Sequence, residues 1–282
     1  MPNYPNNAST TASLTTYVFT SLRKRIAEHP GPLHRLHIGD TYLDPLPVAQ
    51  AQAQRTDEHE GLHRYAAVQG QSELLRAIGE KLMRRSGVRV PLDNIQVTAG
   101  ATAGLSTACQ ALLDPGDEVL VLAPFWPLSA GIVAARGAVA VQVPFYDKLT
   151  NAEFDPEAAL ESAITPRTVA IYVNTPNNPT GVALSDDVLD VLARVATRHQ
   201  LWVMSDEVYE DLWLGPHELT PLWTRPNLAQ RTVAIHSMSK GYGLAGARVG
   251  WMHGPLEAMR AIRAVQTFHS YCASKPMQLA AA

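Results

Sequence analysis

The sequence predicts an α/β fold in which helices cover both faces of a mostly parallel sheet. Short apolar runs, such as residues 95–98 and 169–173, are typical of buried strands. They alternate with longer segments, such as residues 186–199, whose apolar side chains recur at helical spacing. This alternation favours a three-layer α/β/α arrangement. With 282 residues, 46% of them apolar, the chain has enough material for a large core.

The first 47 residues predict an N-terminal arm and linker. Four apolar residues lie at helical spacing: Val18, Phe19, Leu22 and Ile26. The helix that they predict ends at the Pro-Gly-Pro of residues 30–32, and a short strand is expected at residues 36–38. A proline-rich connection at residues 44–47 closes the arm. We therefore expect residues 48–282 to form one large domain.

From residue 72 onward the predicted elements follow one another without a repeat. The predicted helices are 74–86, 101–113 and 186–199, the last capped by Ser185. The predicted strands are 95–98, 119–122, 139–143, 169–173, 201–205 and 232–236, with a short β-like run at 247–252. In parallel sheets of this kind, ligands bind beyond the carboxyl ends of the strands. The segments that follow the strands are therefore the first place to look for a site.

Composition and charge exclude several function classes. The formal net charge is −3 and the charges are well mixed, so nucleic acid is not an expected partner. The two cysteines, Cys109 and Cys272, are too few for a disulfide framework and are expected to be reduced. The polar N-terminus has no secretory signal, and no apolar run is long enough to span a membrane. A cytoplasmic protein is the expectation.

Two motifs suggest other functions and must be weighed first. Gly241, Gly243 and Gly246 have the spacing of a dinucleotide-binding turn, but β-like residues follow them where that motif needs a helix. His59 and His63 match the HExxH pattern of zinc hydrolases, which needs both imidazoles on one helical face. Gly61 between them disfavours a helix. Histidines in a loop are the simpler interpretation, and a zinc hydrolase stays a distant alternative.

A larger set of residues resembles the fold-type I pyridoxal-phosphate enzymes, specifically the class I/II aminotransferases. The matching residues follow the family's order and spacing over most of the chain. They are Tyr65 with Gly70, Gly100-Ala101-Thr102, Trp126, Asn174 to Gly181, Asp206 with Tyr209, and Ser237, Ser239 and Lys240 with Arg248. The resemblance implies the large domain of a pyridoxal-phosphate-dependent transferase with pyridoxal 5'-phosphate as cofactor.

The resemblance implies catalytic roles for three residues. Lys240 would form the Schiff base with the cofactor aldehyde and later move the proton between substrate and cofactor. Asp206 would pair with the pyridine nitrogen and hold it protonated. Tyr209 would bond to the phenolic oxygen together with Asn178. Taken singly, each residue is more often a surface lysine, a loop carboxylate, a half-buried aromatic or a turn asparagine.

The resemblance also implies how the rest of the cofactor and the substrate are held. Gly100, Ala101 and Thr102 open a helix directly after a strand, where backbone N–H groups can bind a phosphate. Ser237, Ser239 and Arg248 would complete the phosphate site, and Trp126 would stack on the pyridine ring. Gly39 and Asn178 would contact the substrate. Thr41 stands where the family usually has proline, which weakens the match near Gly39.

Tyr65 resembles the tyrosine that reaches the phosphate of the neighbouring subunit in this family, so the resemblance implies a homodimer. Family members continue into a small C-terminal domain with an arginine that clamps the substrate carboxylate. This sequence ends at Ala282, so we expect that small domain to be absent from the chain.

Amino-group transfer between an L-amino acid and a 2-oxo acid is the predicted reaction. The same residues also serve β-elimination, decarboxylation and ring closure in related enzymes, so another pyridoxal-phosphate reaction is the main alternative. The substrate side chain is not predicted. A non-catalytic sensor is disfavoured, because the arm is too short to hold a DNA-binding domain.

Overall fold

The computed structural model describes residues 8–12, 14, 20–34, 38–41, 43–55, 57–216 and 218–282. In these residues a sheet of seven strands lies between layers of helices, which confirms the predicted α/β class. The strands are β1 Ile95–Thr98, β2 Glu118–Ala123, β3 Val139–Pro144, β4 Thr168–Asn174, β5 Trp202–Asp206, β6 Thr232–Ser237 and β7 Gly250–His253. All six strands predicted beyond residue 72 are present, and the β-like run at 247–252 contains β7.

The sheet is mostly parallel, with strand order β1-β7-β6-β5-β4-β2-β3. The pairs β2–β3, β2–β4, β4–β5 and β5–β6 are parallel, whereas β7 runs antiparallel to both β6 and β1. Ser237 at the end of β6 pairs with Gly250 at the start of β7. Residues 238–249 therefore form one loop at the carboxyl end of β6.

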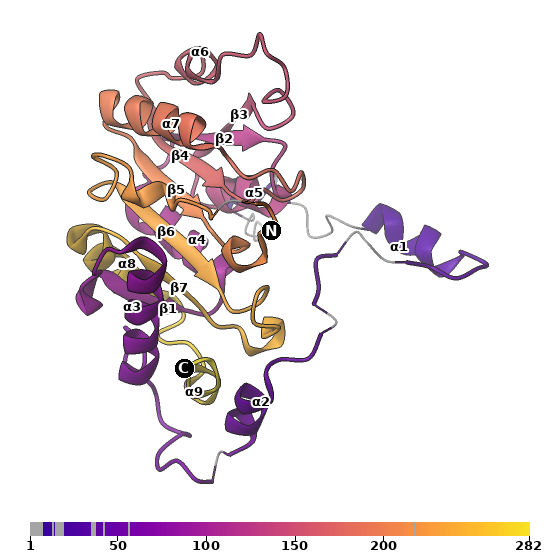
Figure 1. Ribbon diagram of the computed structural model, residues 1–282, viewed down its shortest axis with the longest axis vertical. Coiled ribbons are helices and arrows are strands. Elements are labelled where there is room, and N and C mark those ends of the chain that lie inside the picture. The colour runs from indigo at the N-terminus through magenta and orange to yellow at the C-terminus, as the bar shows by residue number, and fades with distance from the viewer. Residues whose placement is uncertain are drawn as a thin grey trace, which may run out of the picture.

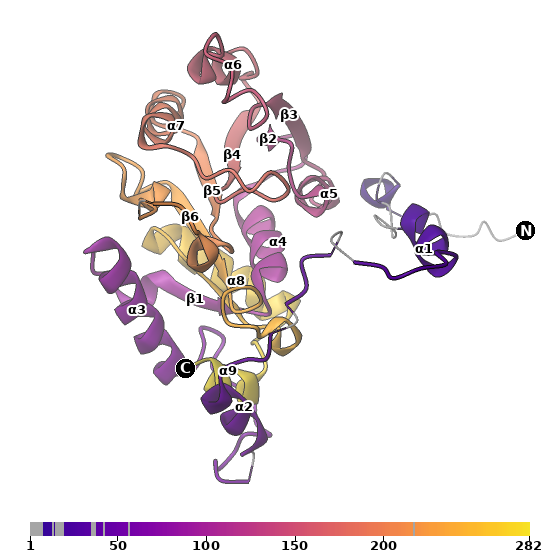
Figure 2. The same cartoon turned by 45° about the vertical axis from the view of Figure 1, so that its right-hand side comes forward.

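Helices cover both faces of this sheet. They are α1 Thr20–Ala27, α2 Pro47–Gln54, α3 Ser72–Ser86, α4 Ala101–Leu112, α5 Pro127–Ala135, α6 Pro156–Glu161, α7 Asp186–Arg198, α8 Leu256–His269 and α9 Lys275–Ala281. One core cluster joins α4, α5 and α8 to one face of the sheet. On the opposite face, a second cluster joins α6 and α7 to the sheet, and a third joins α3 to it. Figure 2 shows α3 and α7 on one side of the sheet and α4 and α5 on the other.

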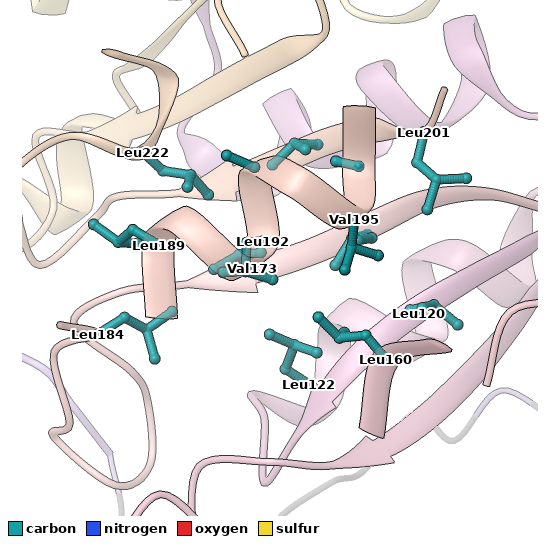
Figure 3. Packing of buried hydrophobic residues seen from close by; sticks show 14 of the residues in the cluster. Leu120, Leu122, Leu160, Val173, Leu184, Leu189, Leu192, Val195, Leu201 and Leu222 are labelled. Atoms are coloured by element: carbon teal, nitrogen blue, oxygen red, sulfur yellow. The ribbon is translucent and has the colours of Figure 1, made fainter. Parts of the chain in front are cut away.

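The helix α7 shows how the sequence pattern becomes packing. Its buried residues include Leu189, Leu192 and Val195, which recur at helical spacing and lie against β4 and β5 (Figure 3). Ser185 occupies the N-cap position as predicted, but its side chain makes no capping hydrogen bond. The prediction of a side-chain cap was therefore wrong. Apolar burial holds the helix, while Asp186 and Asp187 lie in the first turn, where the helix dipole favours negative charge.

Part of the N-terminal arm lies away from the sheet, whereas its short 3-10 helix Ser9–Thr11 packs against α5. The helix α1 lies away from the rest of the described chain in Figures 1 and 2, and α2 packs against α9. Val18, Phe19 and most of the strand expected at 36–38 lie outside the described residues, and Ile38 is in a bend. Among the described residues, no helix has both the length and the apolar character to cross a bilayer.

Candidate active site

Three neighbouring strands bring most of the predicted site residues together. Asp206 is the last residue of β5, and the loops that hold Asn178 and Lys240 follow β4 and β6 on either side of it. Because these strands are parallel, their carboxyl ends meet at one edge of the sheet. The helix α4 begins near the same edge, since the main chain at Gly100 and Ala101 lies against Gly250 of β7.

Asp206 is a buried carboxylate that other groups hold in place. Its side chain accepts a hydrogen bond of 2.6 Å from Tyr172 Oη, and a longer one of 3.3 Å from the Val208 amide. Burial raises the pKa of Asp206, while the Tyr172 and Val208 bonds and the nearby His236 act against that rise. A carboxylate in such a place favours a positively charged partner, because its own ionisation is otherwise costly.

Lys240 lies beside Tyr209 and Gly39. Its Nζ donates a hydrogen bond to the Gly39 carbonyl and lies 6.0 Å from the centre of the Tyr209 ring. Asn178 Nδ2 donates to Tyr209 Oη at 3.2 Å, so these residues form one connected group. Burial lowers the pKa of Lys240; Arg248 acts in the same direction, whereas Asp40 opposes it. A lowered pKa leaves more of the amine neutral, which is the form that attacks a carbonyl carbon.

The turn between β1 and α4 is shaped for close approach. Gly100 has φ 84°, and a Cβ there would lie 2.4 Å from Arg248 Nη2. Only glycine fits such a position without strain. Arg248 Nη1 donates to Ser239 Oγ at 3.3 Å, and the Ser239 amide donates to Ser237 Oγ at 3.0 Å. The first turn of α4 thus faces two hydroxyls and a guanidinium, and no side chain caps the helix.

Two further predicted residues lie outside this connected group. Trp126 is half-buried at the N-cap of α5, beyond the carboxyl end of β2. Tyr65 is 83% exposed and makes an edge contact with Tyr271, at 5.2 Å between ring centres. Ala101 and Thr102 occupy the first turn of α4, with Thr102 exposed.

A family model for "Aminotransferase class I and II" matches residues 32–282. The chain belongs to this family. It is 38% identical over 210 residues to the aspartate/prephenate aminotransferase of Thermus thermophilus, covering 74% of this chain and 53% of that protein. It is 37% identical to a probable N-succinyldiaminopimelate aminotransferase of Mycobacterium tuberculosis, covering 79% and 56%.

Solved aminotransferases share the fold over nearly the whole chain. The aspartate aminotransferase of Rhizobium meliloti superposes with a TM-score of 0.90 and 32% identity, covering 98% of this chain and 70% of that one. The chain nevertheless spans only about half the length of the first curated relatives that it matches.

Members of the class I and II aminotransferases use pyridoxal phosphate, and the residues present here fit that group. A Cβ on Gly100 would fill the space between the start of α4 and Arg248, where a phosphate finds N–H, hydroxyl and guanidinium donors. Among the described residues Asp206 forms no direct ion pair, and a protonated pyridine nitrogen would supply one. Lys240 lies next to Tyr209. This is the position that a lysine would need if it held the cofactor aldehyde while Tyr209 bonded to the phenolic oxygen.

The two competing motifs do not form the structures that their functions need. After β6, the residues of the Gly241 to Gly246 run form turns and the start of a 3-10 helix, with no α-helix among the described residues of that loop. The interpretation of these glycines as a dinucleotide-binding turn is therefore wrong. His59 and His63 lie in consecutive turns, with Gly61 at φ 73°, so their imidazoles do not share a helical face. This removes the geometric basis of a zinc hydrolase.

Tyr172, which bonds directly to Asp206, was not among the predicted site residues. A signal was available, because a phenol inside an otherwise apolar buried strand needs a polar partner. Residues behind the site were missed as well, among them Lys81, Glu210 and Tyr242.

Proposed function

We propose that this chain is the cofactor-binding part of a pyridoxal-phosphate-dependent aminotransferase. It would move an amino group between an L-amino acid and a 2-oxo acid. The observation that carries the proposal is the convergence of the Lys240 amine with the Asn178–Tyr209 pair beside the buried Asp206. Residues 48–282 form the cofactor domain in this proposal, and residues 1–47 form the arm.

Each residue then has a task that its surroundings support. Pyridoxal phosphate, when bound, supplies an aldehyde for the amino group and a ring that accepts electrons. Lys240 holds the aldehyde and then moves a proton at the substrate Cα, aided by its lowered pKa. Asp206, oriented by Tyr172, stabilises a proton on the ring nitrogen.

The remaining residues bind and orient. Tyr209 and Asn178 would hold the phenolic oxygen by hydrogen bonds, and Trp126 would stack on the ring. Gly100, Ala101 and Thr102 supply N–H groups for the phosphate, with Ser237, Ser239 and Arg248 on its other side. Gly39 and Asn178 would contact the substrate, since the Gly39 carbonyl accepts from the Lys240 amine and Asn178 donates to Tyr209 beside it.

We also propose that the chain acts as a homodimer in which Tyr65 reaches the partner's phosphate. Exposed aromatic side chains support this: Tyr65 and Tyr271 are in contact, and Phe268, near the end of α8 and three residues before Tyr271, is 92% exposed. Exposed apolar patches mark interaction surfaces. Sedimentation of the purified chain tests it, and a monomer at high protein concentration would rule it out. A cytoplasmic location stays a prediction from the two unpaired cysteines.

The test of the function is an amino-transfer assay on the full chain loaded with pyridoxal phosphate. A panel of L-amino acids, including aspartate and arginine, is incubated with a panel of 2-oxo acids. We expect one new amino acid for each donor consumed, and none with the Lys240→Ala variant. Release of ammonia or carbon dioxide instead would indicate another pyridoxal-phosphate reaction. Equal transfer by parent and variant would end the assignment.

A further inference from the structure

A half-buried lysine on α3, Lys81, connects the two loops that hold the candidate catalytic residues. Lys81 Nζ donates to Asp211 Oδ2 at 2.5 Å and to Tyr242 Oη at 2.7 Å. Asp211 comes two residues after Tyr209, and Tyr242 comes two residues after Lys240. One ammonium group therefore bridges the loop after β5 and the loop after β6.

Two carboxylates, the buried Glu210 and the more exposed Asp211, balance the charge of this lysine. Its Nζ lies 3.1 Å from Glu210 Oε1, which also accepts from His236 Nδ1 at 3.1 Å. Arg85, one turn further along α3, lies 3.1 Å from the other Glu210 oxygen. Burial alone would lower the pKa of Lys81, but Glu210, Asp211 and Tyr242 together raise it. The lysine is thus held in its charged form at the centre of the cluster.

The two loops also touch each other directly at this point. A Cβ on Gly241, next to Lys240, would lie 2.8 Å from the Cβ of Asp211. The loops can therefore approach only because residue 241 is glycine, and Lys81 ties them at that contact. Loss of the tie would let Lys240 move relative to Tyr209, which lies at 6.0 Å from its amine.

The cluster lies on the opposite face of the sheet from the core that surrounds α4. Along a strand, successive side chains point to opposite faces. On β6, Ile235 belongs to the core cluster of α4 and α8, whereas Ala234 belongs to that of α3. His236 therefore points toward α3, and its neighbour Ser237 points toward α4. The Lys81 amine, ion-paired with Glu210 on the His236 side, lies behind the loops that hold the candidate catalytic residues.

On these observations we propose that Lys81 is a positioning residue, which holds the loop of Lys240 against the loop of Asp206 and Tyr209. The inference rests on the proposed function for its catalytic meaning. The role in positioning Lys240 is independent of that function.

A metal ion is the competing use of this cluster. Among the described residues, Glu207, Glu210 and His236 are the group whose ligand atoms lie close enough to hold an ion. Lys81 and Arg85 already lie against Glu210, and their charges repel a further cation. The geometry therefore favours the lysine tie.

The test compares three variants of the full chain. Lys81→Met removes the charge and keeps the length, and Tyr242→Phe removes one hydroxyl and keeps the ring. Arg84→Met is the matched control, because Arg84 is exposed on the same helix and loses the same charge. The first readout is acetylation of Lys240 in cofactor-free protein, followed by peptide mass spectrometry over a pH series. The second is the pH titration of the visible band with pyridoxal phosphate bound, together with kcat and KM.

We expect the pH midpoint of Lys240 acetylation to rise toward that of a free lysine in Lys81→Met, and less so in Tyr242→Phe. The reason is that a displaced Lys240 regains water. The Arg84→Met protein should match the parent. In the loaded protein the visible titration should shift, and kcat should fall about 10-fold or more with little change in KM.

The outcomes separate the two proposals. A parent protein that takes up no pyridoxal phosphate contradicts the proposed function, while the acetylation series still decides the role of Lys81. An unchanged Lys240 midpoint in both variants, with only the Tm lowered, overturns the positioning role. If Lys81→Met does not fold, Tyr242→Phe decides by the same criterion.

Discussion

At the scale of single residues, the site depends on groups whose charge is set by burial. Asp206 has a raised pKa and Lys240 a lowered one, with desolvation as the largest cause in both. Uncompensated burial of a charge costs folding free energy, which the folded chain accepts where a ligand will later supply a partner. We therefore expect function and stability to oppose each other at Asp206.

Asp206→Asn tests that opposition. The substitution keeps the shape and can still pair with Tyr172, but it removes the buried charge. We expect the cofactor-free variant to have a higher Tm than the parent, while amino transfer falls by about 100-fold or more, because the ring nitrogen loses its counter-charge. Thermal unfolding and the transfer assay measure the two effects. A variant that is less stable yet fully active would contradict this account of Asp206.

At the scale of elements, the start of α4 is the feature on which phosphate binding would depend in the proposed function. A Cβ on Gly100 would meet Arg248, and the φ of 84° disfavours any other residue. Gly116 has a similar φ of 93° but open space around its Cβ position. It is not one of the residues proposed to bind the phosphate. The two glycines therefore share a positive φ and differ in what surrounds the Cβ position.

Gly100→Ala and Gly116→Ala form a matched pair. Both should lower the Tm, since alanine is strained at a positive φ. Only Gly100→Ala should weaken pyridoxal-phosphate binding, by about 10-fold or more, because it displaces one charge-assisted donor. Equilibrium titration of the visible band gives the dissociation constants. Equal weakening in both variants would mean that strain, and not the Arg248 contact, explains the loss.

The elements also show what sequence can and cannot predict. Strands β1 to β6 were predicted because each is a short apolar run. The helix α7 was predicted because its apolar residues recur clearly at helical spacing. No helix was predicted at α5 or α6, since α5 is apolar on most sides and α6 has six residues. The bond from Tyr172 to Asp206 joins residues 34 positions apart, and the Lys81 to Asp211 bond spans 130. Such contacts depend on strand order and helix placement, which local patterns do not give.

At the scale of the whole molecule, the buried cluster behind the site makes stability depend on pH. His236 has a pKa above the ordinary 6.5: burial lowers it, but Glu210 more than compensates. Glu210 has a pKa below the ordinary 4.5: burial raises it, but His236, Lys81 and Arg85 outweigh that effect. The His236 contribution is complete below pH 6.5 and is lost as pH rises through its folded pKa. The Glu210 contribution is complete above pH 4.5 and is lost as pH falls.

We therefore expect this cluster to stabilise the cofactor-free chain most between pH 4.5 and 6.5. Glu207, whose pKa burial raises, also favours the lower pH. Urea unfolding, measured within this window and at alkaline pH, should show that the free energy of unfolding falls as the pH rises. The fall should be smaller in His236→Asn than in the parent. An identical fall in both proteins would show that other groups cause it.

The most direct test of the central claim is to find where the cofactor attaches. The chain is incubated with pyridoxal phosphate, reduced with borohydride, digested and examined by peptide mass spectrometry, with Lys240→Ala in parallel. We predict one added phosphopyridoxyl group, on the peptide that contains Lys240, and none in the variant. Attachment spread over surface lysines, or equal labelling of the variant, would contradict the assignment of Lys240 and the function built on it.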